Sequence, residues 1–123
     1  MKTIKGIRNE AIRQRTRVYI NGKQLSLKKS LEYVRIGYSG FEWGYGGAGP
    51  QQLSFAILLE LTNEYIAHAL CGSFAEEFVA KLPKGNFEIP IEAAMRAIGK
   101  VSNNPSDPLY FAHKEKYKER YQS

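Results

Sequence analysis

The residues best suited to bind a ligand gather between positions 41 and 52, where the sequence reads FEWGYGGAGPQQ. This stretch places the only tryptophan of the chain, Trp43, beside Tyr45, and six of the eleven glycines lie between Gly37 and Gly49. Glycine loses more conformational freedom on folding than any other residue, so the cluster indicates positive φ angles or close backbone approach. Flat aromatic rings beside bare backbone favour a ligand that carries a nucleobase.

The glycine-rich turn leads into an apolar segment that we expect to form a helix starting at Gly49–Pro50. The first N–H groups of a helix have no partner within it and carry partial positive charge, which favours phosphate. We therefore predict that Trp43 or Tyr45 stacks on a base beside a bound phosphate. The residues expected around that phosphate are Gly46, Gly47, Gly49 and Gln51.

A different interpretation of the same stretch is purely structural. Phe41 and Trp43 would belong to the core, and the glycines would only let a sheet and a helix approach closely. The sequence by itself leaves both interpretations open.

Three arginines give the expected phosphate further partners. RQRTRVYI (13–20) alternates like a strand and ends at Asn21–Gly22, a strong signal for a type I′ hairpin. Because side chains alternate along a strand, one face should carry Arg13, Arg15 and Arg17. Guanidinium groups bind phosphate through charge-assisted hydrogen bonds, so these three complete the predicted site.

The charge distribution agrees with an anionic partner. The chain carries a net charge of +6, made up of +8 over residues 1–36, −5 over 37–95 and +3 over 96–123. Segregation of this kind favours binding to an anion, although a basic, well-solvated surface would have the same composition.

Other chemistry finds little support in the sequence. His68 and His113 are far apart and neither is near Cys71, so the spacing of a metal site is absent. GYGGAGP lacks the GK[ST] ending of a phosphate loop that hydrolyses nucleotides. We expect a protein that is not an enzyme and has no metal or cofactor. A single cysteine, no secretion signal and no long apolar run predict a cytoplasmic protein without a membrane segment.

The periodicity predicts an α+β fold, with a small antiparallel sheet, an N-terminal hairpin and helices packed on one face. We expect one domain, mostly strands over 1–47 and mostly helices over 49–99. The expected strands are 3–8, 13–20, the return strand KQLSL, an extended 41–45 and NFEI, and 31–36 is expected to be a strand or a helical turn. The expected helices start at Gly49, at Ser73 in a capping box and at Pro90, the last ending at Gly99.

The C-terminal segment 108–121 is aromatic and basic, and we expect a helix or an arm. Tyr110 and Phe111 are predicted to close the ligand pocket, across the interface of a homodimer or higher homo-oligomer. A surface helix packed on the core is the alternative.

WGYGGAGPQQL (43–53) resembles the core of an uncharacterised bacterial and phage domain family, marked by WGYGGxGPxQL. FAEEFVAKLP and NFEIP resemble the segments that follow in that family, and the resemblance covers about residues 13–99. Ala48 departs from the pattern, since the family often has serine there, and a hydroxyl contact to phosphate would be lost. The chain is also similar to the first-described type of phage anti-Thoeris protein.

The second resemblance implies a protein that binds a cyclic ADP-ribose isomer made by TIR enzymes. It would hold this signal without cleaving it and so block bacterial anti-phage immunity. Two other functions remain open: a basic nucleic-acid-binding module, for which no recognition motif is present, and an inhibitor that contacts a host defence protein.

Overall fold

The structure is a computed structural model that describes residues 2–9, 15–37 and 39–102. Arg13, Tyr110 and Phe111 lie outside the described residues, as does the expected C-terminal helix or arm. Arg15 is described as part of a strand, without its side chain.

The sheet has four antiparallel strands in the order β3-β2-β1-β4. These are β1 (Thr3–Asn9), β2 (Arg15–Ile20), β3 (Lys23–Gln24) and β4 (Phe87–Pro90). The alternation predicted for the hairpin sets the register, in which Ile4 pairs with Ile20 and Gly6 with Val18. Those four residues are all buried, so this face of the sheet contributes to the core.

The predicted hairpin turn is confirmed. Asn21 and Gly22 have φ angles of 54° and 81°, the two positive values that a type I′ turn requires. The return strand is shorter than expected, because the Ser26 hydroxyl accepts the Lys29 N–H at 3.0 Å and starts a helix.

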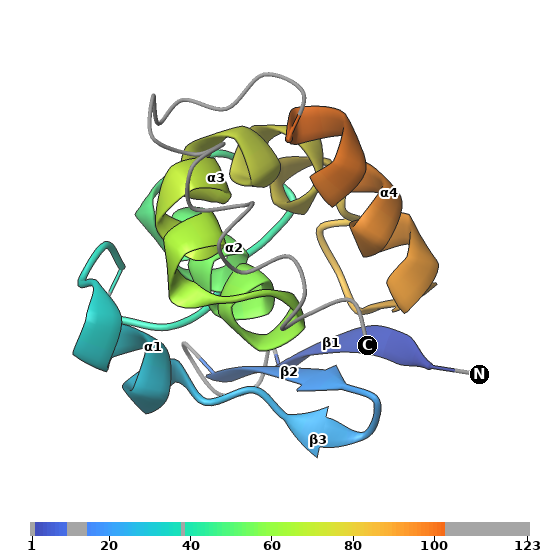
Figure 1. Ribbon diagram of the computed structural model, residues 1–123. Helices are drawn as coiled ribbons and strands as arrows, with labels where there is room; N and C mark the ends of the chain where they lie inside the picture. Colours follow the sequence, from blue (N-terminus) through green and yellow to red (C-terminus); the bar gives the residue numbers. More distant parts are fainter. Residues whose placement is uncertain (1, 10–14, 38, 103–123) are drawn as a thin grey trace.

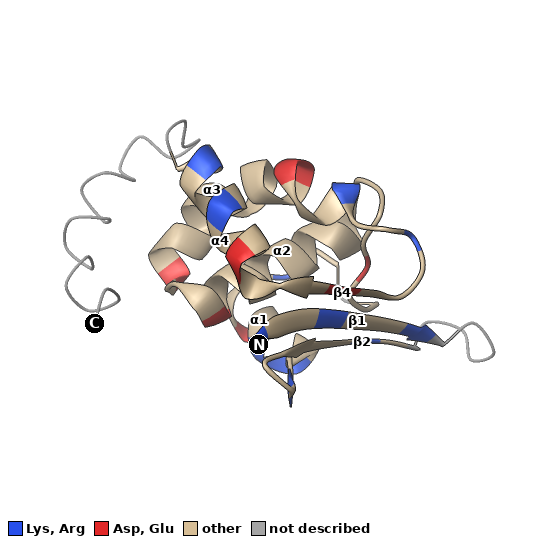
Figure 2. Ribbon diagram, turned by 90° about the vertical axis from the view of Figure 1, so that its right-hand side faces the viewer, with Lys and Arg blue, Asp and Glu red and all other residues tan. Residues whose placement is uncertain are grey.

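Within the described ranges, four α-helices and one short 3-10 helix pack with this sheet. They are α1 (Leu27–Tyr33), α2 (Ala48–Leu61), α3 (Glu64–Glu77), η1 (Val79–Lys81) and α4 (Ile91–Val101). Figures 1 and 2 show α2, α3 and α4 on one side of the sheet, while no helix of the described residues covers the other side of β1 and β2. The α+β prediction is confirmed.

Several predicted elements are wrong in their bounds or type. The helical alternative for 31–36 holds only for the first half of the segment, which ends α1, and the remainder is coil. The first 47 residues are therefore not mostly strands. Ser73 does not cap a helix: Asn63 does so, its side chain accepting the Ile66 N–H at 2.9 Å, and α3 then continues past Gly72. Likewise α4 continues past Gly99 to Val101.

Helix α2 is the centre of the core, as its apolar sequence predicts. From Pro50 to Leu58 only Gln51 is exposed. The large side chains Leu53, Phe55 and Ile57 are at most 1% exposed. Burial on every side indicates that the sheet, α1 and α3 all depend on the placement of this helix.

Gln52 is the one long polar side chain in that core, and its amide ties α1 to α2. Its oxygen accepts the backbone N–H groups of Ile36 at 2.8 Å and Gly37 at 3.0 Å. Its nitrogen donates to the Ser30 hydroxyl at 2.9 Å and to the Val34 carbonyl at 3.1 Å. The four bonds satisfy this fully buried amide and fix the path of the chain that follows α1.

We predict that Gln52→Ala lowers the free energy of unfolding by about 2–4 kcal/mol, because it leaves buried N–H groups unpaired and opens a cavity. The adjacent Gln51 is exposed, so Gln51→Ala is the matched control and should stay within about 0.5 kcal/mol of the parent protein. Urea denaturation measures both. Equal effects of the two substitutions would contradict the role assigned to Gln52.

Candidate functional site

Trp43 does not belong to an open site. Its side chain is 0% exposed, and its ring packs edge-on against Phe87 with centroids 5.1 Å apart at 83°. The indole N–H donates to the Gly85 carbonyl at 2.8 Å. The prediction that this ring stacks on a ligand is therefore wrong, and Trp43, like Phe41, has the structural role that the sequence left open.

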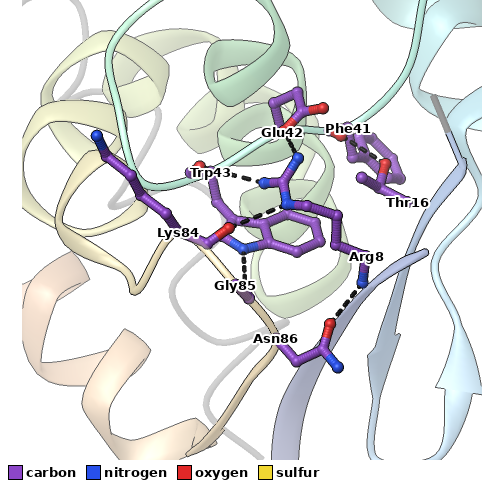
Figure 3. Close-up of polar contacts among 8 residues, drawn as sticks. All are labelled: Arg8, Thr16, Phe41, Glu42, Trp43, Lys84, Gly85 and Asn86. Atoms are coloured by element: carbon purple, nitrogen blue, oxygen red, sulfur yellow. Dashed lines mark hydrogen bonds and ion pairs between the residues drawn. The ribbon is translucent and has the colours of Figure 1, made fainter. Parts of the chain in front are cut away.

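An arginine that the sequence analysis missed holds Trp43 in place. Arg8 lies on the core-facing side of β1, and its guanidinium carbon is 4.6 Å from the centre of the indole ring (Figure 3). The same guanidinium pairs with Glu42 at 2.5 Å and donates to the Lys84 carbonyl at 3.0 Å. This group, which we call the Arg8 clamp, joins β1 to the loops around residues 42–43 and 84–86.

The backbone of Arg8 extends the clamp. Its N–H donates to the side-chain oxygen of Asn86 at 2.7 Å, beyond the point where β4 stops pairing with β1. One signal for Arg8 was present in the sequence. In TIKGIR, residues 4, 6 and 8 share a face, so an arginine falls on the face of Ile4 and needs partners there.

Several glycines of the 41–52 stretch are explained by packing. Gly44 has a φ angle of 85°, and a Cβ there would lie 3.0 Å from Lys84 and 3.1 Å from the Leu82 carbonyl. A Cβ on Gly49 would lie 2.8 Å from the Glu42 side chain. Gly49 makes room for Glu42 and is not among the residues around the adjacent hollow, and its N–H is one of the first N–H groups of α2.

Tyr45 lies outside the core, whereas Trp43 is buried in it. We expected residues 41–45 to be extended with all three aromatic rings on one face, but the left-handed conformation at Gly44 ends the alternation. Phe41 and Trp43 are buried, whereas Tyr45 is 47% exposed.

After Gly44, four of the residues predicted to bind the ligand line one hollow of about 200 Å³, which we call the glycine hollow. It is lined on the α2 side by Tyr45, Gly46, Gly47 and Gln51, and on the α3 side by small residues and Glu76. Gly46 has open space over its Cα, with nothing within 4 Å of an added Cβ. Packing therefore gives no reason for glycine at position 46.

The glycine hollow has groups of both polarities. Gly47 precedes α2 and provides no side-chain cap, so the first N–H groups of the helix have no side-chain acceptor there. On the opposite wall stands the Glu76 carboxylate, near the C-terminal end of α3. Burial, reinforced by Glu42, raises the pKa of Tyr45 against an opposing effect of Arg8, so its phenol keeps its proton at neutral pH. The hollow offers donors and an acceptor.

Arg17 lies elsewhere. It lines a second hollow of about 500 Å³, which we call the Arg17 groove, together with Lys28, Ser26 and Ser39. The groove is lined by residues of β2, of the segment that leads into α1 and of the loop 39–41, and it shares no lining residue with the glycine hollow. The structure thus divides the predicted site into two parts, with the buried Trp43 in neither.

Groups that support covalent or metal chemistry are sparse in the described part of the chain. Burial raises the pKa of the Cys71 thiol, which lies 3.3 Å from the Gln51 carbonyl, so it is protonated and packed at neutral pH. No group of three or more potential metal ligands occurs among the described residues. Within the same ranges, no helix combines the length and apolar character needed to cross a membrane.

One known protein family matches most of the chain. The model of a family of unknown function, DUF6166, matches residues 5–100, and the chain belongs to this family. No curated protein and no solved structure matches it.

We predict that Arg8→Ala lowers the free energy of unfolding by about 2–3 kcal/mol, because the charge-assisted bonds and the cation–π contact are lost together. Arg8→Lys should recover only part of this, since an ammonium lacks the planar fork that reaches several acceptors. Lys5→Ala, on the opposite face of β1, is the control. Urea denaturation followed by Trp43 fluorescence measures all three, and an unchanged stability of Arg8→Ala would contradict the clamp.

Proposed function

We propose that this member of the DUF6166 family binds a nucleotide-derived small molecule in the glycine hollow and holds it without cleaving it. The observation that supports this most is the arrangement of Tyr45, Gly46, Gly47 and Gln51 around one hollow at the uncapped start of α2.

Each part of a nucleotide has a partner in the hollow. A base can lie on the exposed face of Tyr45, where base–aromatic stacking contributes about 1–3 kcal/mol. A phosphate is favoured at the first N–H groups of α2. A ribose hydroxyl or an exocyclic amine can donate to Glu76. The carboxylate also disfavours a ligand that places all of its negative charge in the hollow, so the base and sugar should occupy the α3 side.

The size of the hollow limits what one copy can enclose. At about 200 Å³ it falls below the roughly 300–1,000 Å³ usual for sites that surround a whole ligand. It fits one nucleoside unit, and in our proposal the rest of a cyclic dinucleotide-like signal is covered by a second copy of the chain in a homodimer or higher homo-oligomer. The proposed ligand is a cyclic ADP-ribose isomer made by TIR enzymes in the host cytoplasm, and its sequestration would block anti-phage immunity.

A second candidate function is favoured by the bare face of the sheet. Lys5 pairs in register with Tyr19, and Ile7 with Arg17, on the side that no described helix covers (Figure 2). Lys5 and Arg17 are exposed and Tyr19 is partly exposed, a combination that suits a single-stranded nucleic acid. Such binding would weaken steeply with log salt, whereas binding in the glycine hollow would not.

We predict that Gly46→Phe abolishes binding of cyclic ADP-ribose isomers without unfolding the protein. Position 46 has free space and a φ angle outside the left-handed region, so the new ring fills the hollow instead of straining the backbone. Calorimetric titration should show the dissociation constant rise at least about tenfold. Gly99→Phe is the control, since that glycine also has open space but lies on α4 away from the hollow.

Two results would overturn the proposal. If Gly46→Phe binds as tightly as the parent protein, the ligand does not occupy the glycine hollow. If mass spectrometry of the ligand released by heat shows a hydrolysed product, the protein is an enzyme. Recovery of the intact ligand supports sequestration.

A further inference from the structure

The Arg17 groove has no part in the ligand binding proposed for the glycine hollow, yet it has the size and chemistry of a binding site. Its volume of about 500 Å³ has room for a small organic molecule, and the groove is open to solvent. Two exposed cations, Arg17 and Lys28, stand at its walls, and none of its described lining residues is acidic.

The surrounding charges strengthen this positive potential. Glu42 follows the groove residue Phe41 directly in the chain, but its carboxylate is paired with Arg8 at 2.5 Å. The groove is also built largely from the first 36 residues, which carry a net charge of +8. A ligand with negative charge therefore meets two cations whose field the nearby carboxylate does not cancel.

The groove offers hydrogen-bond donors and an apolar surface as well. The Ser26 hydroxyl accepts from the Lys29 N–H, a bond that leaves its own proton free to donate. Ser39 contributes a second, exposed hydroxyl. Leu25, Leu27 and Phe41 give the walls an apolar part that suits the body of an organic ligand.

Hydrogen bonds made by the lining residues themselves fix the walls of the groove in advance. The Thr16 hydroxyl donates to the Phe41 carbonyl at 2.5 Å and joins β2 to the loop that forms the opposite wall. The Leu25 N–H donates to the Val18 carbonyl at 2.7 Å and holds the segment between β3 and α1 against β2. A preformed site loses little conformational entropy when a ligand binds.

We infer that the Arg17 groove is a second binding site, separate from the glycine hollow, for a small organic molecule that carries a phosphate or diphosphate group. Arg17 and Lys28 would hold the phosphate oxygens, the guanidinium through paired N–H donors. The hydroxyls of Ser26 and Ser39 would complete the polar contacts, while the apolar walls receive the organic body.

The test uses full-length Gly46→Phe protein, whose glycine hollow is filled, and calorimetric titration with ADP, pyrophosphate and adenosine. We expect ADP to bind at one site per chain and adenosine to bind at least about tenfold more weakly. Adding Arg17→Glu and Lys28→Glu should weaken ADP binding at least about tenfold. Adding Lys2→Glu and Arg96→Glu, which make the same change in net charge at exposed positions outside the groove, should change it less than about twofold.

Three outcomes would overturn this inference. The first is that neither ADP nor pyrophosphate binds at millimolar concentration. The second is that the two charge-reversed pairs weaken ADP binding equally. The third is that adenosine binds as tightly as ADP. The result is separable from the function proposed for the glycine hollow. If the glycine hollow binds no nucleotide but the groove does, the parent protein and Gly46→Phe bind ADP with the same stoichiometry. The variants with Arg17→Glu and Lys28→Glu still lose ADP binding.

Discussion

The contact between the Arg8 guanidinium and the Trp43 indole determines how the 41–52 stretch is used. It holds a partly buried cation, 22% exposed, and Glu42, the Lys84 carbonyl and the π-face of the ring compensate for its lost contact with water. In satisfying that cation, the chain draws the indole into the core and brings the loops 41–43 and 84–86 against β1. The candidate surfaces on either side of Trp43 are consequences of this anchoring.

Two anchors together make the glycine-rich turn rigid. The Arg8 clamp holds residues 42–43, and Gln52 holds the backbone at residues 36 and 37 from within α2. Between them, Gly44 and Gly49 allow backbone and side chains to approach more closely than a Cβ would permit. Tyr45 and Gly46 are exposed to solvent next to these anchored residues. Preorganisation of this kind is what a small site needs to bind tightly with few contacts.

The sequence predicted what depends on local or periodic signals. The Asn21–Gly22 turn, the buried helix α2 and the α+β class all follow from patterns within a few residues. Predictions from the sequence were wrong where contacts between residues distant in the chain determine the position of a side chain. Trp43 looks like a ligand-binding ring until Arg8, 35 positions earlier, and Gly85, 42 positions later, are brought against it. The same limit explains why Arg17 and Tyr45 were assigned to a single site, although they line different hollows.

The central claim is that the anchored turn exposes a preformed hollow at residues 45–47 while the indole beneath it stays enclosed. Amide NMR spectra of isotopically labelled protein, recorded during titration with a cyclic ADP-ribose isomer, test it most directly. The account predicts large shifts for the N–H groups of Tyr45, Gly46, Gly47 and Ala48, with the indole N–H of Trp43 nearly unmoved. If the indole resonance shifts most, or the signals of the turn do not respond to any nucleotide, the account is contradicted.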